Sequence, residues 1–151
     1  MMEKKTIKRY IYERDGRCCT YCGKELLFKQ ISLDHHFPRS RGGSDDVFNM
    51  VLSCRKCNKL KSSRIPQIYE ENMIRLFQKA LEDRRINISK VKFSHDELLK
   101  IAADIDRVED FGGDCTVFQS PFYRILVYRG SIEKMTILSG YRNLLSDIDN
   151  A

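Results

Sequence analysis

The sequence has no long hydrophobic run and no hydrophobic segment at its N-terminus. Of its 151 residues 42% are hydrophobic, yet no stretch approaches the roughly 20 apolar residues of a membrane-spanning helix. The first segment, MMEKKTIKRYIYERDG, is charged throughout and lacks the apolar centre of a signal peptide. We therefore expect no membrane anchor and a cytoplasmic location. Internal repeats and low-complexity linkers are also absent, and the length fits one domain, or a small module with an appendage.

Acidic residues are scarce in the first half of the chain. Residues 1–65 contain 15 lysines and arginines against 7 aspartates and glutamates, whereas residues 66–151 contain 12 against 14. A basic half suits a polyanionic partner such as nucleic acid, although a solvated basic surface is the common alternative.

Six cysteines in a chain without a leader sequence favour metal binding over disulfides. Four of them form two Cys-x2-Cys pairs, and 31 residues separate Cys22 from Cys54. Each pair presents two sulfurs from a tight turn, and two facing turns complete a tetrahedral zinc site. The predicted ligands of this structural zinc are Cys19, Cys22, Cys54 and Cys57.

The other two cysteines are expected to play no part in metal binding. Cys18 could replace Cys19 in a Cys-x3-Cys spacing, but Cys-x2-Cys forms the tighter turn, and Gly23 permits the positive φ that such a turn needs. Cys115 stands alone and is expected to be a small buried apolar side chain.

The hydrophobic pattern predicts an α+β fold. We expect helices over residues 6–15, 55–63, 66–85, 94–108 and 141–148, and strands over residues 31–37, 47–53, 116–118, 123–128 and 135–138. Ser94 and Glu97 predict a capping box at the start of their helix, and Gly112 follows its expected end. The apolar residues 26–28 are expected to pack beneath the zinc site.

The central stretch carries several motifs in a fixed order. These are Asp34-His35-His36-Phe37-Pro38, Arg41-Gly42-Gly43, Asn49, Cys54-Arg55-Lys56-Cys57-Asn58 and Lys61, preceded by Arg14-Asp15-Gly16 and the first cysteine pair. Together they resemble the HNH endonuclease family, and the opening resembles that of bacterial and phage members. The resemblance covers about residues 6–64. It implies a small ββα-metal core with zinc knuckles in residues 1–64, followed by an α+β extension in residues 65–151.

The resemblance also implies an activity and roles for individual residues. A metal-dependent DNA endonuclease would use His35 as general base and would hold one Mg²⁺ with Asp34 and Asn58, leaving 5′-phosphate and 3′-hydroxyl ends. Asn49 would brace the loop that presents the histidine. Asn58 stands where the family name places its second histidine, so the ligands are oxygen atoms, which favour Mg²⁺ or Mn²⁺ over zinc or nickel.

Two adjacent histidines make the choice of base a separate question. Alternation along a strand would place Asp34 and His36 on one face and His35 on the other. The spacing from His35 to Asn49 and on to Asn58 follows the family register, which favours His35. His36 is then expected to pack beneath the site or to contribute a ligand. His95, far along the chain, is expected to be a solvated or capping residue.

Basic residues surround the predicted site and are expected to contact DNA phosphates. They are Arg39, Arg41, Arg55, Lys56, Lys59, Lys61 and Arg64. The alternative function is a non-catalytic zinc-containing module that binds nucleic acid, which would use the same basic residues without a working base. The extension is expected to form a homodimer or to select the target, and a protein-interaction role for it is compatible with either function. A single site cuts one strand, so cutting both strands would need a dimer or two successive events.

Overall fold

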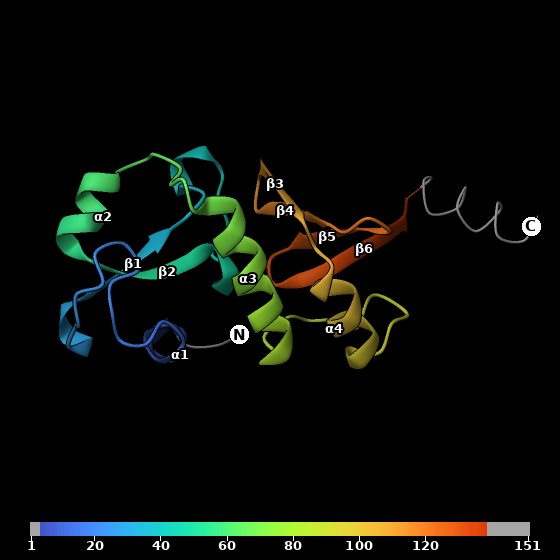
Figure 1. The fold of residues 1–151 in the computed structure, drawn as a ribbon, viewed down its shortest axis with the longest axis horizontal. Coiled ribbons are helices and arrows are strands. Elements are labelled where there is room, and N and C mark those ends of the chain that lie inside the picture. The colour runs from blue at the N-terminus through green and yellow to red at the C-terminus, as the bar shows by residue number, and fades with distance from the viewer. Residues whose placement is uncertain (1–3, 139–151) are drawn as a thin grey trace, which may run out of the picture.

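The computed structural model describes residues 4–138, in which helices and two antiparallel sheets are combined. The expected α+β class is confirmed. Helix α3 lies between a β-hairpin followed by α2 on one side and a four-stranded sheet with α4 on the other (Figure 1). The elements are α1 (Lys4–Arg14), η1 (Phe28–Gln30), β1 (Ile31–His35), η2 (Arg39–Arg41), η3 (Val47–Asn49), β2 (Met50–Cys54), α2 (Arg55–Lys61), α3 (Tyr69–Glu82), α4 (His95–Ala103), β3 (Arg107–Gly112), β4 (Cys115–Gln119), β5 (Tyr123–Tyr128) and β6 (Ser131–Ile137).

The predicted strand, strand and helix order is confirmed in the first half of the chain. Strands β1 and β2 pair antiparallel, with Ile31 opposite Cys54 and His35 opposite Met50. Both strands are shorter than predicted, because β1 ends at His35 before the turn into Pro38, and residues 47–49 form the 3₁₀ turn η3 instead of extended chain. Helix α2 follows β2 directly.

The end of α1 is tied to the hairpin by charged side chains. Arg14 donates from Nη1 to the carbonyl of Val47 at 2.7 Å and from Nη2 to that of Met50 at 2.5 Å. Asp15 pairs with Arg14 at 2.8 Å, and its Oδ2 accepts from the backbone N–H of Leu52, also at 2.8 Å. Buried charges are stable only when paired and hydrogen-bonded, as these are. The contacts fix where the chain enters the first cysteine turn.

Two hydrophobic cores share the hairpin. The smaller core, called the zinc-side core after the predicted zinc site beside it, consists of Ile11, Tyr12, Cys19, Leu26, Ile31, Met50 and Leu52. The main core is formed by α3, α4 and the four-stranded sheet, together with Phe48 and Val51 from the hairpin. Successive strand residues point to opposite faces, so β2 sends Met50 and Leu52 into one core and Val51 into the other. The division of the chain into residues 1–64 and 65–151 stays a prediction, and the two parts share this packing.

In the second half, the largest departure from the sequence expectation is at the end of α4. Helix α4 begins with the predicted capping box, in which Ser94 and Glu97 each bond the other's backbone N–H, but it ends at Ala103 and not at Val108. Residues 107–112 form β3, which the sequence analysis missed. Val108 is buried from this strand, and its spacing from Ile105 matched a helical stripe by coincidence. The glycines at 112 and 113 accordingly form the β3–β4 turn and do not follow a helix.

Smaller differences concern single residues and boundaries. The expected strand over residues 135–138 begins earlier, at Ser131. Leu27 is 59% exposed and does not pack beneath the zinc site, whereas Leu26 is 3% exposed and does. The helix expected over residues 141–148 lies outside the described residues. Across residues 4–138 no helix is both long and apolar enough to cross a membrane.

Candidate functional site

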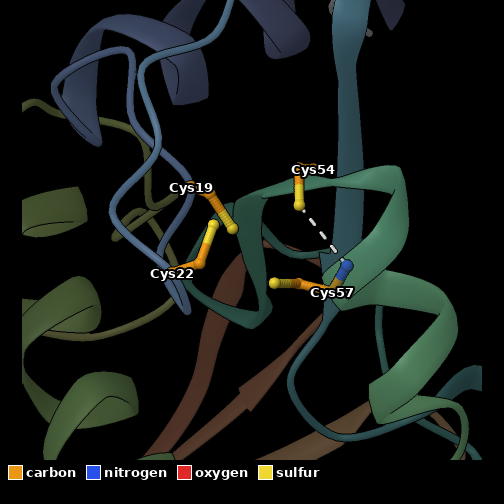
Figure 2. A group of neighbouring side chains, drawn as sticks. All are labelled: Cys19, Cys22, Cys54 and Cys57. Atoms are coloured by element: carbon orange, nitrogen blue, oxygen red, sulfur yellow. Dashed lines mark hydrogen bonds between the residues drawn. The ribbon is translucent and has the colours of Figure 1, made fainter.

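Four cysteine sulfurs meet at the end of the hairpin. The Sγ atoms of Cys19, Cys22, Cys54 and Cys57 all lie within 4.8 Å of one another, and Figure 2 shows the pair on the first loop facing the pair at the start of α2. A tetrahedral zinc with Zn–S bonds of about 2.3 Å requires sulfurs about 3.8 Å apart. Among the described residues, this is the one group of three or more histidines, cysteines or acids placed to hold a metal. The donor set therefore fits zinc.

The local chain geometry explains why these four residues meet. The first turn closes with the Gly23 N–H donating to the Cys19 carbonyl at 2.9 Å, and Gly23 has the left-handed φ of 76° that the sequence suggested. Thr20 N–H bonds the Leu52 carbonyl at 2.9 Å, which fastens the turn to β2. The second pair spans the start of α2, where the sulfur of Cys54 caps the helix by accepting from Cys57 N–H at 3.4 Å.

The pKa values of two thiols of the cluster, Cys19 and Cys57, shift in opposite directions. Burial raises the pKa of Cys19, but hydrogen bonding from the backbone of Cys54, Cys22 and Tyr21 outweighs it and lowers the pKa to about 6. Hydrogen bonding with Cys54 is the main cause that raises the pKa of Cys57 to about 12. The opposite directions follow from closely spaced sulfurs that share protons, so Cys19 ionises more readily than Cys57. Zinc binding would displace the remaining protons, so its affinity would fall at low pH.

A second polar site lies at the other end of β1. The side chains of Asp34, His35 and Asn58 line one open cleft of about 310 Å³, together with Leu33, Pro38, Arg39, Ser40, Ser62 and Ser63. Sequence reasoning grouped the first three residues, and the structure brings them to the same cleft. The remaining lining is mostly polar, and Arg39 and Ser40 lie on the loop that follows β1.

The two adjacent histidines lie in opposite environments, as strand alternation requires. The side chain of His35 is 25% exposed, and its Nε2 lies 2.8 Å from Asp45 Oδ1. His36 is fully buried, with Nδ1 at 3.0 Å from the Tyr21 hydroxyl and Nε2 at 3.0 Å from the side-chain nitrogen of Asn72. Burial, followed by the positive charge of Lys61, lowers the pKa of His36 to about 4, so its ring is neutral at pH 7.

A buried hydrogen-bond network surrounds Asp34. Its Oδ2 accepts a short hydrogen bond from the Tyr21 hydroxyl, and its Oδ1 lies 3.1 Å from the Lys61 ammonium. Lys61 also donates to the His35 carbonyl at 2.9 Å. Because the Tyr21 proton is given to Asp34, the Tyr21 oxygen accepts from His36 Nδ1, and His36 Nε2 accepts from Asn72. The network joins the first cysteine turn, β1, α2 and α3.

Asn49 braces the loop between the two strands. Its Oδ1 accepts from Phe37 N–H at 2.8 Å, while its Nδ2 donates to the carbonyls of Phe37 at 3.1 Å and Ser44 at 2.8 Å. Asn49 is fully buried, and these three bonds satisfy both ends of its amide. No other residue type of this size offers the same pair of donors and acceptors, so the side chain sets the course of the chain immediately after His35.

The basic residues predicted to contact DNA fall into two groups. Most are exposed around the cleft and α2: Arg39, Arg41, Arg55, Lys56, Lys59 and Arg64. Lys61 is the exception, because its side chain is 7% exposed and its ammonium is bound to Asp34 and His35. Asn58 donates from Nδ2 to Ser32 Oγ at 2.7 Å, which leaves its amide oxygen as the atom that it can offer to a ligand.

Sequence reasoning missed three residues of this region. Tyr21 could have been singled out, because it lies between Cys19 and Cys22 in the turn that presents these two cysteines. Asp45 lies in a polar loop, and its contact with His35 has no spacing signature. Asn72 reaches His36 from α3 across 36 positions of sequence, which only the tertiary packing determines.

The hairpin and α2 thus carry a four-cysteine cluster at one end, and a cleft with a carboxylate, a histidine and an amide at the other. Residues 19–74 match the family described as HNH endonuclease, so the resemblance read from the sequence is confirmed over that segment. The chain is also 33% identical over 61 residues to the CRISPR-associated endonuclease Cas9 of Corynebacterium diphtheriae. This match covers 40% of the present chain and 6% of the relative, so the chain spans only a small part of that protein's length.

Proposed function

We propose that this chain is a metal-dependent endonuclease that hydrolyses phosphodiester bonds in DNA. The observation that carries the proposal is the single cleft lined by Asp34, His35 and Asn58, inside the segment that matches the HNH endonuclease family. The endonuclease named among its relatives supports the same class of activity. A module that merely binds nucleic acid would not need this combination of side chains.

His35 is the general base in this proposal. Its ring is partly exposed at the cleft, where a neutral imidazole nitrogen can accept a proton from an attacking water. His36 is a poor candidate, because both of its ring nitrogens are occupied by Tyr21 and Asn72 in the interior. We assign His36 a packing role beneath the site.

Asp34 and Asn58 are the proposed ligands of a divalent cation. Each carboxylate oxygen of Asp34 has two acceptor positions, so its bonds to Tyr21 and Lys61 leave one on each oxygen. Together with the amide oxygen of Asn58 they form an oxygen donor set, which fits Mg²⁺ or Mn²⁺. When bound, the cation would supply positive charge to the phosphate and to the departing oxygen. Lys61 holds Asp34 in place and neutralises part of its charge.

The remaining parts of the site have supporting roles. The four cysteines hold a structural zinc, and Asn49 positions the loop after His35. The exposed arginines and lysines bind phosphates on either side of the cut bond: Arg39, Arg41, Arg55, Lys56, Lys59 and Arg64. One such site cuts one strand, so cutting both strands would require two copies of the chain or two successive events.

Cleavage of supercoiled plasmid in Mg²⁺ tests the proposal. We expect wild-type protein to produce nicked and then linear DNA, and His35→Ala to be slower by about 10²- to 10⁴-fold, the usual contribution of a general base. The matched control is His95→Ala, since His95 bonds the Leu81 carbonyl at the end of α3 and lies outside the cleft. Zinc content is measured in all three proteins beforehand.

Two results would contradict these assignments. If no protein cut DNA but all retarded it in a gel, the alternative of a non-catalytic zinc-containing nucleic-acid-binding module would replace the nuclease. If His36→Ala kept its fold and lost activity as completely as His35→Ala, the assignment of the base to His35 would be wrong.

A further inference from the structure

The exposed ring of His35 is held by a residue that has no assigned role. Its Nε2 lies 2.8 Å from Asp45 Oδ1. An ionised carboxylate can only accept hydrogen bonds, so in the neutral ring Nε2 carries the proton and Nδ1 is the acceptor. The contact therefore selects the tautomer whose Nδ1 can take a proton from water.

Asp45 itself needs support, because its side chain is 70% exposed on a loop. Arg39 supplies it, with Nε at 3.7 Å from Asp45 Oδ1 and Nη1 donating to the Gly43 carbonyl at 2.7 Å. The same Nη1 lies 3.1 Å from Oδ1 of Asp114, which belongs to the β3–β4 turn of the distant sheet. Asp114 is fixed in turn by Arg129, whose Nε donates to its Oδ2 at 3.1 Å. The chain of contacts runs from the second half of the molecule to His35.

Backbone packing joins the same two segments. Asp114 N–H bonds the Gly42 carbonyl at 3.1 Å. A Cβ on Gly42 would lie 2.7 Å from the Gly113 nitrogen and 2.8 Å from the Gly112 Cα, and the φ of Gly42 is +89°. No side chain fits at this contact. The glycine of the loop after β1 is thus explained by the close approach of the β3–β4 turn.

We infer that Asp45 is a positioning residue for His35 and that the β3–β4 turn, through Asp114, completes the nuclease site. This inference rests on the proposed function, since it gives Asp45 a role only if His35 is the base. It also gives the second half of the chain a part in catalysis that neither dimerisation nor target selection describes. Arg39, one of the proposed phosphate contacts, is also the link between the two acids.

Nitrogen-15 NMR of the histidine side chains tests the tautomer without any need for activity. At pH 8 we expect wild-type His35 to show the Nε2–H form, Asp45→Ala to show a mixture of both tautomers, and Asp114→Ala to shift partway towards that mixture. His35→Gln identifies the His35 signals among the three histidines. Asp106→Ala removes an equal charge from an exposed residue near β3 and is the matched control.

Cleavage kinetics supply the second readout. Asp45→Ala is expected to lower kcat about 10- to 100-fold, as is common for a group that orients a histidine, with the DNA KM and the half-saturating Mg²⁺ concentration nearly unchanged. Asp45→Asn, which keeps an acceptor oxygen, is expected to recover part of the loss. Asp114→Asn retains the shape of the turn, and its kcat is expected to lie between those of Asp114→Ala and wild type.

The outcomes separate this inference from the proposed function. A wild-type tautomer and rate in Asp45→Ala would overturn the positioning role, and the same result in both Asp114 variants would overturn the part of the β3–β4 turn. If wild-type protein cut no DNA but the tautomer responded to Asp45→Ala, the positioning of His35 would be supported while the nuclease proposal failed.

Discussion

The two cores of the chain are stabilised in different ways. The zinc-side core contains 7 buried residues, including Cys19, and it is formed by α1, loops and one side of the hairpin. The main core contains 16 buried residues, most of them from helices and a four-stranded sheet. A core as small as the first rarely stabilises a fold by apolar burial alone, whereas the second is large enough to do so. The difference shows why the metal-binding cysteines lie in the first half.

Removal of zinc should show the difference in stability between the two cores most clearly. Binding of a structural zinc contributes on the order of 10 kcal/mol in small zinc modules, so Cys54→Ser is expected to unfold the zinc-side core. Hydrogen exchange should show lost protection in α1, β1 and β2, with protection retained in β4 and β5. Cys115→Ser, at a partly exposed cysteine outside the cluster, is the control and should keep its zinc. Full protection of the hairpin in zinc-free Cys54→Ser would show that the zinc-side core does not depend on zinc for its stability.

Truncation of Phe48 should weaken the contact between the halves. Its ring meets those of Phe77 and Phe118 edge to face, with centroids 5.6 Å and 5.3 Å away. Phe48→Ala is expected to lower the free energy of unfolding by about 3–5 kcal/mol, the usual cost of removing a buried phenylalanine. Denaturant unfolding measures this value, and Phe111→Ala, at a site 61% exposed, should change it little. Equal effects of the two substitutions would contradict the assigned packing.

The pH dependence of stability tests the contact between the two halves of the chain at Asp46. Burial raises the pKa of Asp46, which lies near Gly130 of the β5–β6 turn, to about 6. Since an unfolded aspartate titrates near about 3.9, the folded state holds more protons between these values, and stability falls as pH rises from about 4 to 6. The loss is about 3 kcal/mol at most and persists above pH 6.

Asp46→Asn should remove this part of the pH dependence. Unfolding free energies from pH 4 to 7 are expected to fall less steeply in the variant than in wild type, and the comparison cancels the pH dependence of zinc binding that both proteins share. Asp106→Asn, at an exposed position, should follow wild type. Parallel curves for wild type and Asp46→Asn would show that the carboxylate is not destabilised by burial.

Tyr21→Phe should have the smallest effect. The change removes the hydroxyl that bonds Asp34 and His36 but leaves the ring and both neighbouring zinc ligands. The free energy of unfolding is expected to fall by about 1–3 kcal/mol, because two buried polar partners lose one hydrogen bond each. Thermal unfolding measures this loss of stability, and zinc stoichiometry is determined in parallel. Tyr128→Phe, at a residue 37% exposed, is the control. Loss of zinc in Tyr21→Phe would mean that the hydroxyl supports the metal site itself.

The features that sequence predicted well depend on local spacing. Each cysteine pair is held together by its own turn, which brings Cys19 close to Cys22 and Cys54 close to Cys57. Alternation along the strand predicts that His35 and His36 lie on opposite faces. The capping box at Ser94 also depends on residues close in sequence. In each case the physical constraint acts within a few positions, so the sequence carries it directly.

The features that sequence failed to predict depend on distant contacts. Val108 had the right spacing for a helix, and only its pairing with Phe118 in β4 makes it part of a strand. Asp45 and Asp114 are polar loop residues without a motif, and Arg39 joins them only after the sheet has packed against the loop. A single sequence contains no local signal for such contacts.

The alternating side chains of β2 have a consequence for any attempt to transplant the segment that matches the HNH endonuclease family. A graft that ends after α2 would carry Phe48 and Val51 into solvent, because their partners lie in α3 and the sheet. A one-residue insertion within β2 would exchange the side chains offered to the two cores. A protein that receives the graft would therefore have to keep the strand register and offer an apolar surface to Val51. The unit that can be transplanted extends beyond the cysteines and the cleft.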